Sequence, residues 1–391
     1  MRTILFFGDS PVANTGLGIV AREILKRLQA TGQYKIICWG VNHWAAYTDP
    51  QEFPYAIYAA GLNRQDDVYG FENFLKLAKT VPHDLLLSIA DLHVIANFAE
   101  QYRKQTRAPW VAYIPVDVAL LETDIRSLAY VTVPVAYTEY GRGQLEQYGI
   151  KAAVIPHGCD TEMLKPVSSD QRRAWRAEHF GIDETTFLVM AVARNQWRKD
   201  LARTMLGFAR FRERHPTSKL YLHSKIKDVG GNLIIQAKAA GLATAKDIIF
   251  APADFDESQG VEVEVLGHLY NCANAVVSTA LGEGWGMSTT EAFAFGVPFL
   301  GPRNTSFIEI VGEDEERGWL SECGNELVVS YGYDDHLRPI TDLESWVAKL
   351  EEIYLGRGVE SKVAAARAWV EERTWDAVGE QWVRLIGKAG G

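Results

Sequence analysis

The chain has 391 residues, of which 47% are hydrophobic and 23% are charged, and its formal net charge at pH 7 is −10. This length accommodates about two globular domains, and the composition is ordinary for a globular protein. The acidic balance disfavours a large electrostatic footprint on nucleic acid, and no apolar run approaches the ~20 residues that span a bilayer. Residues 1–165 are near neutral by count, so a polyanionic partner would have to meet this half.

The beginning of the chain and its cysteines bear on the cellular compartment. An apolar strand is expected at residues 3–7, so close to Met1 that we expect no signal peptide. The cysteines are far apart and lack the spacing of metal ligands; they are Cys38, Cys159, Cys272 and Cys323. We therefore expect reduced thiols, a cytoplasmic protein and no integral membrane segment.

Apolar strands alternate with amphipathic helices through the first 160 residues, a pattern typical of a parallel sheet built from βαβ units. Gly16 and Gly18 lie between the first strand and a helix expected at residues 19–30, where they would let the backbone approach a diphosphate. An ordinary tight turn explains these two glycines equally well. Asp117 follows a strand at residues 110–114, at the carboxyl end where ligands of open α/β sheets bind. Further strands are expected at residues 34–39, 84–89, 131–136 and 153–155.

The second half repeats this pattern after a polar, helical linker at residues 161–185. The two halves therefore indicate an α/β fold of two Rossmann-like domains that face each other across a cleft, with any ligand in that cleft. Strands are expected at residues 187–192, 219–223, 247–250, 275–278 and 298–301, and helices at residues 202–215, 260–272, 343–355 and from about 359 onward.

Two basic residues follow the first strand of the second half. Arg194 and Lys199 lie five residues apart on the loop at the carboxyl end of this strand. The planar fork of an arginine and the point charge of a lysine can together grip a diphosphate. A solvated surface loop is the alternative, but the position of the pair, ahead of the glycine-rich loop described next, favours a function.

A glycine-rich loop follows the fourth strand of this half. Gly282, Gly284 and Gly286 allow the backbone to approach a ligand closely. The helix that follows offers unpaired N–H groups and a partial positive charge, which suit a phosphate. Ser288 and Glu291 have the spacing of a capping box, which predicts Ser288 as the N-cap of this helix.

Glu283 and Glu291 bracket this seat for a phosphate. A phosphate needs hydrogen-bond donors, so two carboxylates beside it indicate a ligand that also carries hydroxyl groups. A nucleotide sugar has both. On these residues alone the alternative stays open, because Glu291 can be a capping residue only and glycine-rich strand-to-helix loops are common.

The order of these motifs resembles the retaining glycosyltransferases of family 4, a glycogen-synthase-like group with the two-domain GT-B fold. The most specific match is the glycine-rich segment, in which Glu283 and Glu291 stand in the pattern Gly-Glu-Gly-Trp-Gly…Glu-Ala-Phe-Ala-Phe-Gly-Val-Pro. The other matches are Thr15-Gly16-Leu17-Gly18, Ile155-Pro156-His157-Gly158-Cys159-Asp160, Arg194 with Lys199, and Thr374-Trp375-Asp376. Together they cover nearly the whole chain.

The resemblance implies that the two domains bind different substrates. Residues 1–165 would form an acceptor-binding domain and residues 166–373 a nucleotide-sugar-binding domain. A C-terminal helix at about 374–391 would cross back onto the first domain. No metal and no resident cofactor is implied, because the nucleotide sugar is a substrate, and whether it is of UDP or GDP type stays open.

The resemblance also implies a role for each matching residue. Arg194 and Lys199 would neutralise the diphosphate, Glu283 would face hydroxyls of the transferred sugar, and Glu291 would take the ribose hydroxyls. The backbone N–H groups of Gly286, Met287 and Ser288 would meet sugar and phosphate, and the loop with Gly16 and Gly18 would close over the phosphates.

Two positions depart from the family pattern. His157 stands where the family more often has Asn, which leaves its role in the cleft open. The histidine that many members carry near the reacting carbon is absent here, and we hypothesise that Asp117 takes its place by orienting a sugar hydroxyl or the acceptor's nucleophile. An Asp that caps the next helix is the alternative. His223, which ends a strand of the second half, is a further candidate for the cleft, with a buried, hydrogen-bonded histidine as the alternative.

The expected reaction is metal-independent, retaining transfer of a sugar, of hexosyltransferase type, through a front-face transition state. Asp254-Phe255-Asp256 has the Asp-x-Asp form that holds a metal in the other large glycosyltransferase fold, but nothing else supports that fold. The alternatives are a sugar-nucleotide epimerase or phosphorylase, and a non-catalytic nucleotide-sugar-binding protein. The acceptor stays open among a glycan or polysaccharide, a lipid carrier, a metabolite and a modified nucleic-acid base in DNA, as does the oligomeric state.

Overall fold

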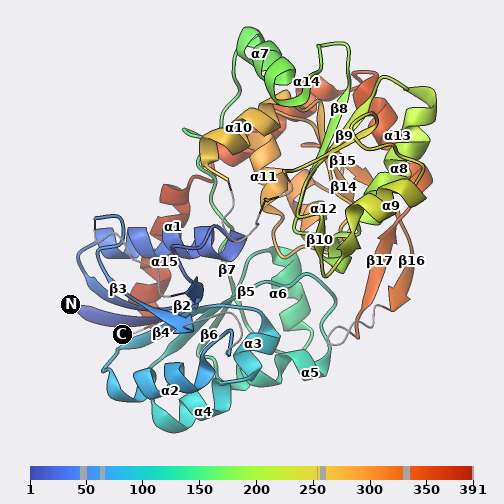
Figure 1. Cartoon of the computed structure of the whole chain (residues 1–391). Coiled ribbons are helices and arrows are strands. Elements are labelled where there is room, and N and C mark those ends of the chain that lie inside the picture. The colour runs from blue at the N-terminus through green and yellow to red at the C-terminus, as the bar shows by residue number, and fades with distance from the viewer. Residues whose placement is uncertain (45–50, 62–66, 253, 256–260, 329–334, 390–391) are drawn as a thin grey trace. The chain divides into compact units, whose positions relative to one another are not determined.

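The computed structural model describes residues 1–44, 51–61, 67–252, 254–255, 261–328 and 335–389. The chain forms two compact units (Figure 1). Unit 1 comprises Met1–Gly158 and Trp375–Gly391, and unit 2 comprises Cys159–Thr374. Each unit is built on its own parallel sheet.

The sheet of unit 1 has seven parallel strands in the order β3-β2-β1-β4-β5-β6-β7. The strands at its centre are apolar and buried on both faces, as the sequence predicts for a parallel sheet. The strands of this sheet are β1 (Arg2–Asp9), β2 (Tyr34–Trp44), β3 (Ala56–Gly61), β4 (Leu85–Ile89), β5 (Trp110–Ile114), β6 (Val133–Ala136) and β7 (Ala153–Val154).

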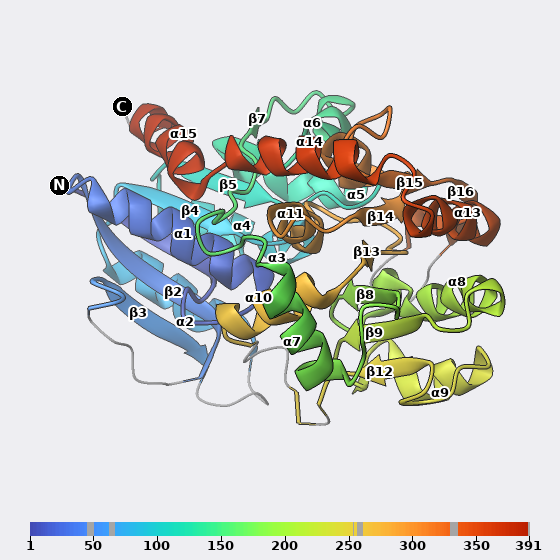
Figure 2. The ribbon, with the colours of Figure 1, turned by 90° about the horizontal axis from the view of Figure 1, so that it is seen from above.

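Helices cover both faces of this sheet (Figure 1 and Figure 2). Because side chains alternate along a strand, Leu5 and Phe7 of β1 enter a core shared with α2, α3 and α4, while Ile4 and Phe6 are buried on the opposite face. The helices are α1 (Gly16–Ala30), α2 (Phe71–Thr80), α3 (Leu92–Ala96), α4 (Ala99–Gln105), α5 (Glu122–Ile125), α6 (Glu139–Glu146) and α15 (Trp375–Ala389), with a 3-10 turn η1 (Arg126–Tyr130).

The C-terminal helix α15 belongs to unit 1 and packs on α1. Arg27 Nη2 of α1 lies 2.8 Å from Asp376 Oδ1. Trp382 is fully buried and meets the ring of Tyr113 edge-on, with 4.8 Å between the ring centroids. Gly379 allows this approach, because a Cβ there would lie 2.3 Å from Cδ of Arg27.

Unit 2 is built on a six-stranded parallel sheet in the order β12-β9-β8-β13-β14-β15. Two antiparallel pairs, β10-β11 and β16-β17, accompany it. The strands are β8 (Leu188–Val192), β9 (Lys219–His223), β10 (Lys227–Asp228), β11 (Gly231–Asn232), β12 (Ile248–Phe250), β13 (Ala275–Val277), β14 (Phe299–Pro302), β15 (Trp319–Ser321), β16 (Cys323–Val328) and β17 (Leu337–Thr341).

The main core of unit 2 lies between one face of this sheet and the helices α8, α9 and α13, and the fully buried Trp346 of α13 is part of it. The helix α11 packs against β13, β14 and α14, and α10 packs against α7. The helices are α7 (Ser169–Phe180), α8 (Leu201–Arg214), α9 (Leu233–Ala239), α10 (Val263–Cys272), α11 (Met287–Ala294), α12 (Thr305–Val311), α13 (Leu343–Tyr354) and α14 (Val359–Glu371), with a 3-10 turn η2 (Trp197–Lys199).

In each sheet the chain reverses its direction of winding beside the first strand of the unit. In unit 1 this switch point lies between β1 and β4, and in unit 2 it lies between β8 and β13. Open α/β sheets bind ligands at the carboxyl ends of the strands at such a point. Among the described residues, no helix combines the length and the apolarity that crossing a bilayer requires.

Candidate active site

Two loops of unit 2 meet at the switch point of its sheet, one after β8 and one after β13. The N–H of Leu281 donates to the carbonyl oxygen of Arg198 at 2.8 Å. Thr279, which is fully buried, donates its hydroxyl to the carbonyl oxygen of Asp200 at 2.8 Å. These bonds fix one loop against the other, so the side chains that they carry share one site.

Glu283 is held between two cations from the β8 loop. Nζ of Lys199 contacts Oε1 of Glu283, and Nη1 of Arg198 lies 3.2 Å from Oε2. Arg198 also donates to the carbonyl oxygen of Gly282 at 3.1 Å. The side chains of Lys199 and Glu283 are only 15% and 13% exposed. The sequence predicts Lys199 and Glu283 as site residues but not Arg198, which stands inside the Arg-x4-Lys pattern without being part of it.

The charges at this cluster determine the protonation of Glu283. Burial raises the pKa of its carboxyl group, but the positive charges of Lys199 and Arg198 outweigh burial, and the pKa lies below its ordinary value. The backbone N–H of Glu283 donates to Thr305 Oγ1 at 3.0 Å, which fixes the residue from the other side. Glu283 is therefore a preorganised carboxylate at neutral pH.

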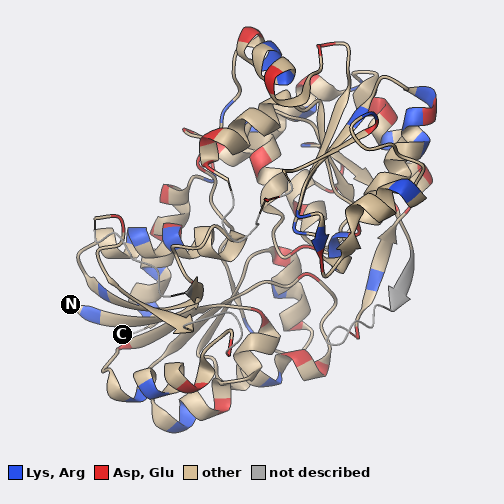
Figure 3. Ribbon diagram, in the orientation of Figure 1, with Lys and Arg blue, Asp and Glu red and all other residues tan. Residues whose placement is uncertain are grey.

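Arg194 lies on the same loop but has a different carboxylate partner. Its Nε lies 2.8 Å from Oδ2 of Asp228, at the end of β10, and its side chain is 53% exposed. The buried Asn195 anchors the β10-β11 hairpin by donating to the carbonyl oxygens of Lys225 and Gly231 at 3.1 and 2.9 Å. Lysine and arginine gather around this hairpin (Figure 3). In this structure, carboxylates thus pair with both of the cations that the sequence assigns to a diphosphate.

The helix α11 begins two residues earlier than the capping-box pattern predicts. Gly286, not Ser288, is the N-cap, and Glu291 is the fifth residue of the helix, so the predicted capping box is wrong. Gly286 adopts a left-handed conformation with φ 91°, which disfavours other residues, and this conformation turns the chain directly into the helix. Gly286, Met287 and Ser288 are half-buried, so this part of the helix start is partly accessible to solvent.

A buried hydroxyl marks the same helix start. Thr289 is fully buried, and its Oγ1 has no hydrogen-bond partner among the described residues. A Cβ on Gly286 would lie 3.2 Å from this oxygen. The first turn of α11 therefore combines backbone donors, the positive end of the helix dipole and a hydroxyl, which is a suitable set of groups for an anion. The sequence does not predict Thr289 as part of the site.

Glu291 lies on α11 and receives a hydrogen bond from α10. The hydroxyl of Tyr270 donates to Oε2 of Glu291 at 2.6 Å. Burial raises the pKa of the Glu291 carboxyl group, and the bond from Tyr270 lowers it by a smaller amount. Tyr270 is another residue that the sequence does not predict, since it follows the helical pattern of the core.

The glycines predicted in the first domain lie in unit 1, in the first turn of α1. Thr15 is the N-cap of this helix: it accepts from Gly18 N at 3.0 Å and donates to the carboxylate of Asp9. A Cβ on Gly18 would lie 2.3 Å from the carbonyl oxygen of Ala13, so packing of the loop demands glycine there. Gly16 is exposed.

Asp117 lies half-buried on the loop after β5 in unit 1. The next helix, α5, has Leu121 as its N-cap, so the alternative in which Asp117 caps it is wrong. Asp9 is the last residue of β1, and Asp91 follows the neighbouring strand β4. The carboxyl edge of the sheet in unit 1 is therefore rich in carboxylates.

Both candidate histidines are buried in their own units. His157 packs among aromatic rings of unit 1, with 4.4 Å to the Tyr137 centroid, and burial lowers its pKa to about 3. His223 ends β9 in unit 2, where its Nδ1 lies 2.9 Å from the hydroxyl of Tyr221, and burial lowers its pKa to about 4. Both imidazoles are therefore neutral at physiological pH.

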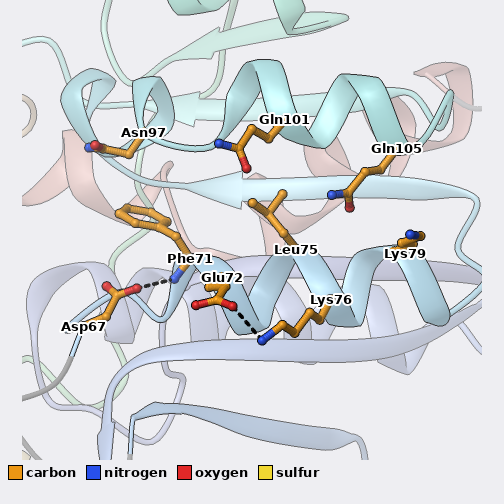
Figure 4. Close-up of a pocket in the computed structure, with 9 residues that line it drawn as sticks. All are labelled: Asp67, Phe71, Glu72, Leu75, Lys76, Lys79, Asn97, Gln101 and Gln105. Atoms are coloured by element: carbon orange, nitrogen blue, oxygen red, sulfur yellow. Dashed lines mark hydrogen bonds and ion pairs between the residues drawn. The ribbon is translucent and has the colours of Figure 1, made fainter.

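The Asp-x-Asp motif lies partly outside the described residues, because Asp256 is not described. Among the residues that are, no group of three or more His, Cys, Asp or Glu side chains is arranged to hold a metal ion. A polar depression in unit 1 lies between α2 and α4 (Figure 4). Amides and charged groups of the helix surface line it, including the ion pair of Glu72 with Lys76 at 2.8 Å, and none of the predicted site residues does.

Comparison with known proteins finds a family model that matches the segment of the chain carrying this site. Residues 172–329 match the family model described as "Glycosyl transferases group 1". This span contains the cluster around Glu283, the start of α11 and the Tyr270–Glu291 pair. Mannosylfructose-phosphate synthase of Agrobacterium fabrum is 29% identical over 160 residues, which are 39% of this chain and 34% of that protein. The match thus spans about a third of the length of that relative.

Solved structures with the same fold cover the whole chain. Sucrose-phosphate synthase of Thermosynechococcus elongatus superposes with a TM-score of 0.76 over 99% of both chains, at 15% identity. The Anabaena protein HepE (Alr3699), solved with UDP and glucose, superposes with a TM-score of 0.73 over 99% of this chain and 100% of its own, at 15% identity. The predicted fold class, two Rossmann-like α/β domains as in the GT-B glycosyltransferases, is confirmed.

Proposed function

We propose that this chain is a retaining glycosyltransferase of family 4, of hexosyltransferase type, that moves a sugar from a nucleotide-sugar donor to a hydroxyl-bearing acceptor. The observation that carries the proposal is the cluster of Glu283 with Lys199 and Arg198 at the switch point of unit 2. It lies inside the segment that matches the group 1 glycosyl transferases, beside a helix start suited to a phosphate. The complex of HepE with UDP and glucose, a protein of the same fold, supports a nucleotide sugar as the donor.

The diphosphate of the donor is the ligand of the cations. Arg194 and Lys199 exchange their present carboxylate partners, Asp228 and Glu283, for phosphate oxygens. The N–H groups at the start of α11 meet the same diphosphate, because the first turn of a helix lacks intrahelical acceptors for them. In the donor-free protein, Asp228 and Glu283 balance the positive charges of Arg194 and Lys199. When the donor binds, its diphosphate balances these charges instead.

The two glutamates take the hydroxyl-bearing parts of the donor. Glu283, kept ionised by its cations, accepts hydrogen bonds from hydroxyls of the transferred sugar. Glu291, eight residues further along the chain and on the helix itself, accepts from the ribose hydroxyls. Carboxylate acceptors beside cationic donors suit a ligand that joins hydroxyls to phosphates.

Transfer then depends on charge stabilisation. As the glycosidic bond breaks, negative charge grows on the diphosphate, and Arg194, Lys199 and the helix start stabilise it. The acceptor hydroxyl attacks on the face from which the diphosphate departs, and a phosphate oxygen takes the proton of that hydroxyl, so the anomeric configuration is retained. Because side-chain cations supply the positive charge, we propose that no metal ion takes part.

Unit 1 supplies the acceptor side in this proposal. Asp117, at the carboxyl end of β5, orients a sugar hydroxyl or the attacking hydroxyl of the acceptor. The loop with Gly16 and Gly18 closes over the phosphates.

Mass spectrometry of reactions with a panel of nucleotide sugars and candidate acceptors tests the proposal. We expect one donor to be consumed with release of its nucleoside diphosphate, and the acceptor to gain the mass of one sugar. Consumption should persist in EDTA. Donor conversion without any acceptor would instead identify an epimerase, conversion that requires inorganic phosphate a phosphorylase, and binding without turnover a non-catalytic protein.

A matched pair of variants ties the activity to the site. Lys199→Ala removes the cation that contacts Glu283, and Lys349→Ala removes a comparable, partly buried lysine of unit 2 that pairs with Glu315 at 2.9 Å. We expect Lys199→Ala to abolish most turnover and Lys349→Ala to retain it. Equal turnover in the two variants would contradict the assignment of the site.

A further inference from the structure

We propose that Tyr270 is a positioning residue: it holds the Glu291 carboxylate where that carboxylate binds the ribose hydroxyls of the donor. As a consequence, the chain selects ribonucleotide donors over 2′-deoxyribonucleotide donors. This inference rests on the proposed function, because it assigns a specificity to the donor site described above. The resemblance implies the ribose contact of Glu291 and assigns no role to Tyr270, a residue that touches no predicted ligand.

The phenol of Tyr270 has little freedom to move. Tyr270 is fully buried on α10, and its ring stacks on Phe295 with 5.1 Å between centroids and 18° between ring planes. Phe295 is the C-cap of α11, the helix that carries Glu291. The ring of Tyr270 therefore packs against the end of α11, and its hydroxyl contacts Glu291 on the same helix. These two contacts together fix the distance between α10 and the Glu291 carboxylate.

The hydrogen bond from Tyr270 gives the two carboxylate oxygens of Glu291 different roles: one accepts from Tyr270, and the other is left for a ligand. The hydroxyl donates to Oε2 at 2.6 Å, a short bond of the kind that a charged acceptor forms. Among the described residues, no hydrogen bond involves Oε1. One carboxylate oxygen has two lone-pair directions, so Oε1 can accept from both vicinal hydroxyls of a ribose. Glu291 is half-buried, which leaves a route for a ligand to reach it.

Tyr270 also supports the charged form of Glu291. Burial raises the pKa of this carboxyl group, which favours the protonated form, and the bond from Tyr270 opposes that effect. A carboxylate whose second oxygen is free and ionised is a strong acceptor, and a donor that lacks a ribose hydroxyl leaves this oxygen partly unsatisfied. Sites built around such an acceptor discriminate against analogues that lack the hydroxyl. We expect discrimination of about 10- to 100-fold in affinity.

Equilibrium binding of nucleoside diphosphates to the full chain tests this assignment. The probes are UDP, GDP and ADP with their 2′-deoxy counterparts, and the proteins are wild type, Tyr270→Phe, Glu291→Gln and Tyr102→Phe. The last variant is the matched control: it removes a buried phenol hydroxyl that lies 2.9 Å from Nε2 of His83 in unit 1. It therefore reproduces the loss of a buried hydroxyl without touching Glu291.

The inference predicts a specific pattern of binding. Wild type and Tyr102→Phe prefer the ribose form of one nucleotide by at least about 10-fold, Glu291→Gln loses most of this preference, and Tyr270→Phe loses part of it, about 3- to 10-fold. Affinity for the 2′-deoxy form changes little in Tyr270→Phe. In this variant the ribose preference also fades at a higher pH than in wild type, because the bond that lowers the pKa of Glu291 is gone. A merely structural role would weaken both forms equally and leave the pH profile in place.

Two failures are distinguishable. If Glu291→Gln loses the preference while Tyr270→Phe keeps the full wild-type ratio of affinities, the role of Tyr270 is refuted and the proposed function stands. If wild type binds none of the nucleoside diphosphates, both the proposed function and this inference are refuted.

Discussion

Nη1 of Arg198 lies 3.2 Å from Oε2 of Glu283, while Lys199, the next residue, contacts the other oxygen of the same carboxylate. One carboxylate thus neutralises two consecutive cations at the position where a donor diphosphate is expected. The same charge that Glu283 offers to a sugar hydroxyl competes with the phosphate for Lys199. This relationship makes affinity for the nucleotide and turnover respond in opposite directions to changes at Glu283.

Glu283→Gln should tighten the binding of the nucleoside diphosphate product and slow the reaction. Without the negative charge, Lys199 no longer exchanges a carboxylate for phosphate, which we expect to favour binding by about 1 kcal/mol, or roughly fivefold in Kd. Loss of the acceptor for the sugar should lower turnover at least about tenfold. Calorimetric titration with UDP and GDP, together with steady-state rates, measures both effects. Glu322→Gln, at an exposed ion pair with Arg303, is the control. Weaker binding together with slower turnover would contradict the competition.

Arg194→Ala and Lys199→Ala should each lower turnover at least about 10²- to 10³-fold, the usual effect of removing one group that stabilises charge in a transition state. Circular dichroism should show that both variants remain folded, because the side chain of Arg194 is largely exposed and Lys199 lies at a loop. Arg198→Ala should resemble Lys199→Ala, since Arg198 helps to orient Glu283. Turnover near that of wild type in Arg194→Ala would remove this residue from the site.

Glu291→Gln should stabilise the donor-free protein at neutral pH while it weakens donor binding. The pKa of Glu291 is raised in the folded state, so its ionisation opposes folding as the pH rises through the ordinary carboxyl value towards the folded one. The gain in Tm should therefore be present at pH 7 and vanish below about pH 4, where folded and unfolded states are both protonated. Thermal unfolding at pH 7 and at pH 3.5 to 4 measures it. Glu380→Gln, which alters an exposed glutamate of α15, should show no such difference. A Tm below that of wild type at pH 7 would contradict the prediction.

Gly18→Ala should destabilise the fold by about 1–3 kcal/mol, because the new Cβ would lie 2.3 Å from the carbonyl oxygen of Ala13. The matched control is Gly143→Ala on α6, where a Cβ meets nothing within 4 Å and alanine favours the helix. Differential scanning calorimetry should show a Tm lowered by several degrees for Gly18→Ala only. Equal Tm values for the two variants would show that the loop yields, and that its glycine is not required by packing.

Asp117→Asn should lower turnover about 10²-fold with little change in donor affinity, since the proposed role of Asp117 lies on the acceptor side. Steady-state rates with the acceptor identified by mass spectrometry give the comparison. Near-wild-type turnover would show that this position does not replace the family histidine.

Much of the fold and part of the site could be predicted because they depend on local patterns. Apolar runs at residues 110–114 and 219–223 coincide with β5 and β9, and their alternation with helices predicts the parallel sheets. Lys199 and Glu283 follow strand ends that the topology brings together, so their meeting could also be expected.

The errors and omissions have physical reasons of their own. Ser288 and Glu291 have capping-box spacing, but the left-handed conformation of Gly286 starts the helix earlier. The spacing of residue types does not predict such a backbone conformation. Tyr270 follows the helical periodicity of a core residue, and only the packing of α10 against α11 brings its hydroxyl to Glu291. Arg198 and Asp228 likewise depend on contacts between loops that are distant in the sequence.

A crystal structure of the protein soaked with its nucleotide-sugar donor, or with the nucleoside diphosphate product, tests the central claim most directly. The account predicts that the diphosphate lies within hydrogen-bond distance of Nζ of Lys199 and of the N–H groups at the start of α11, with the ribose at Glu291. A nucleotide lodged elsewhere, away from both the cations and the helix start, would contradict it.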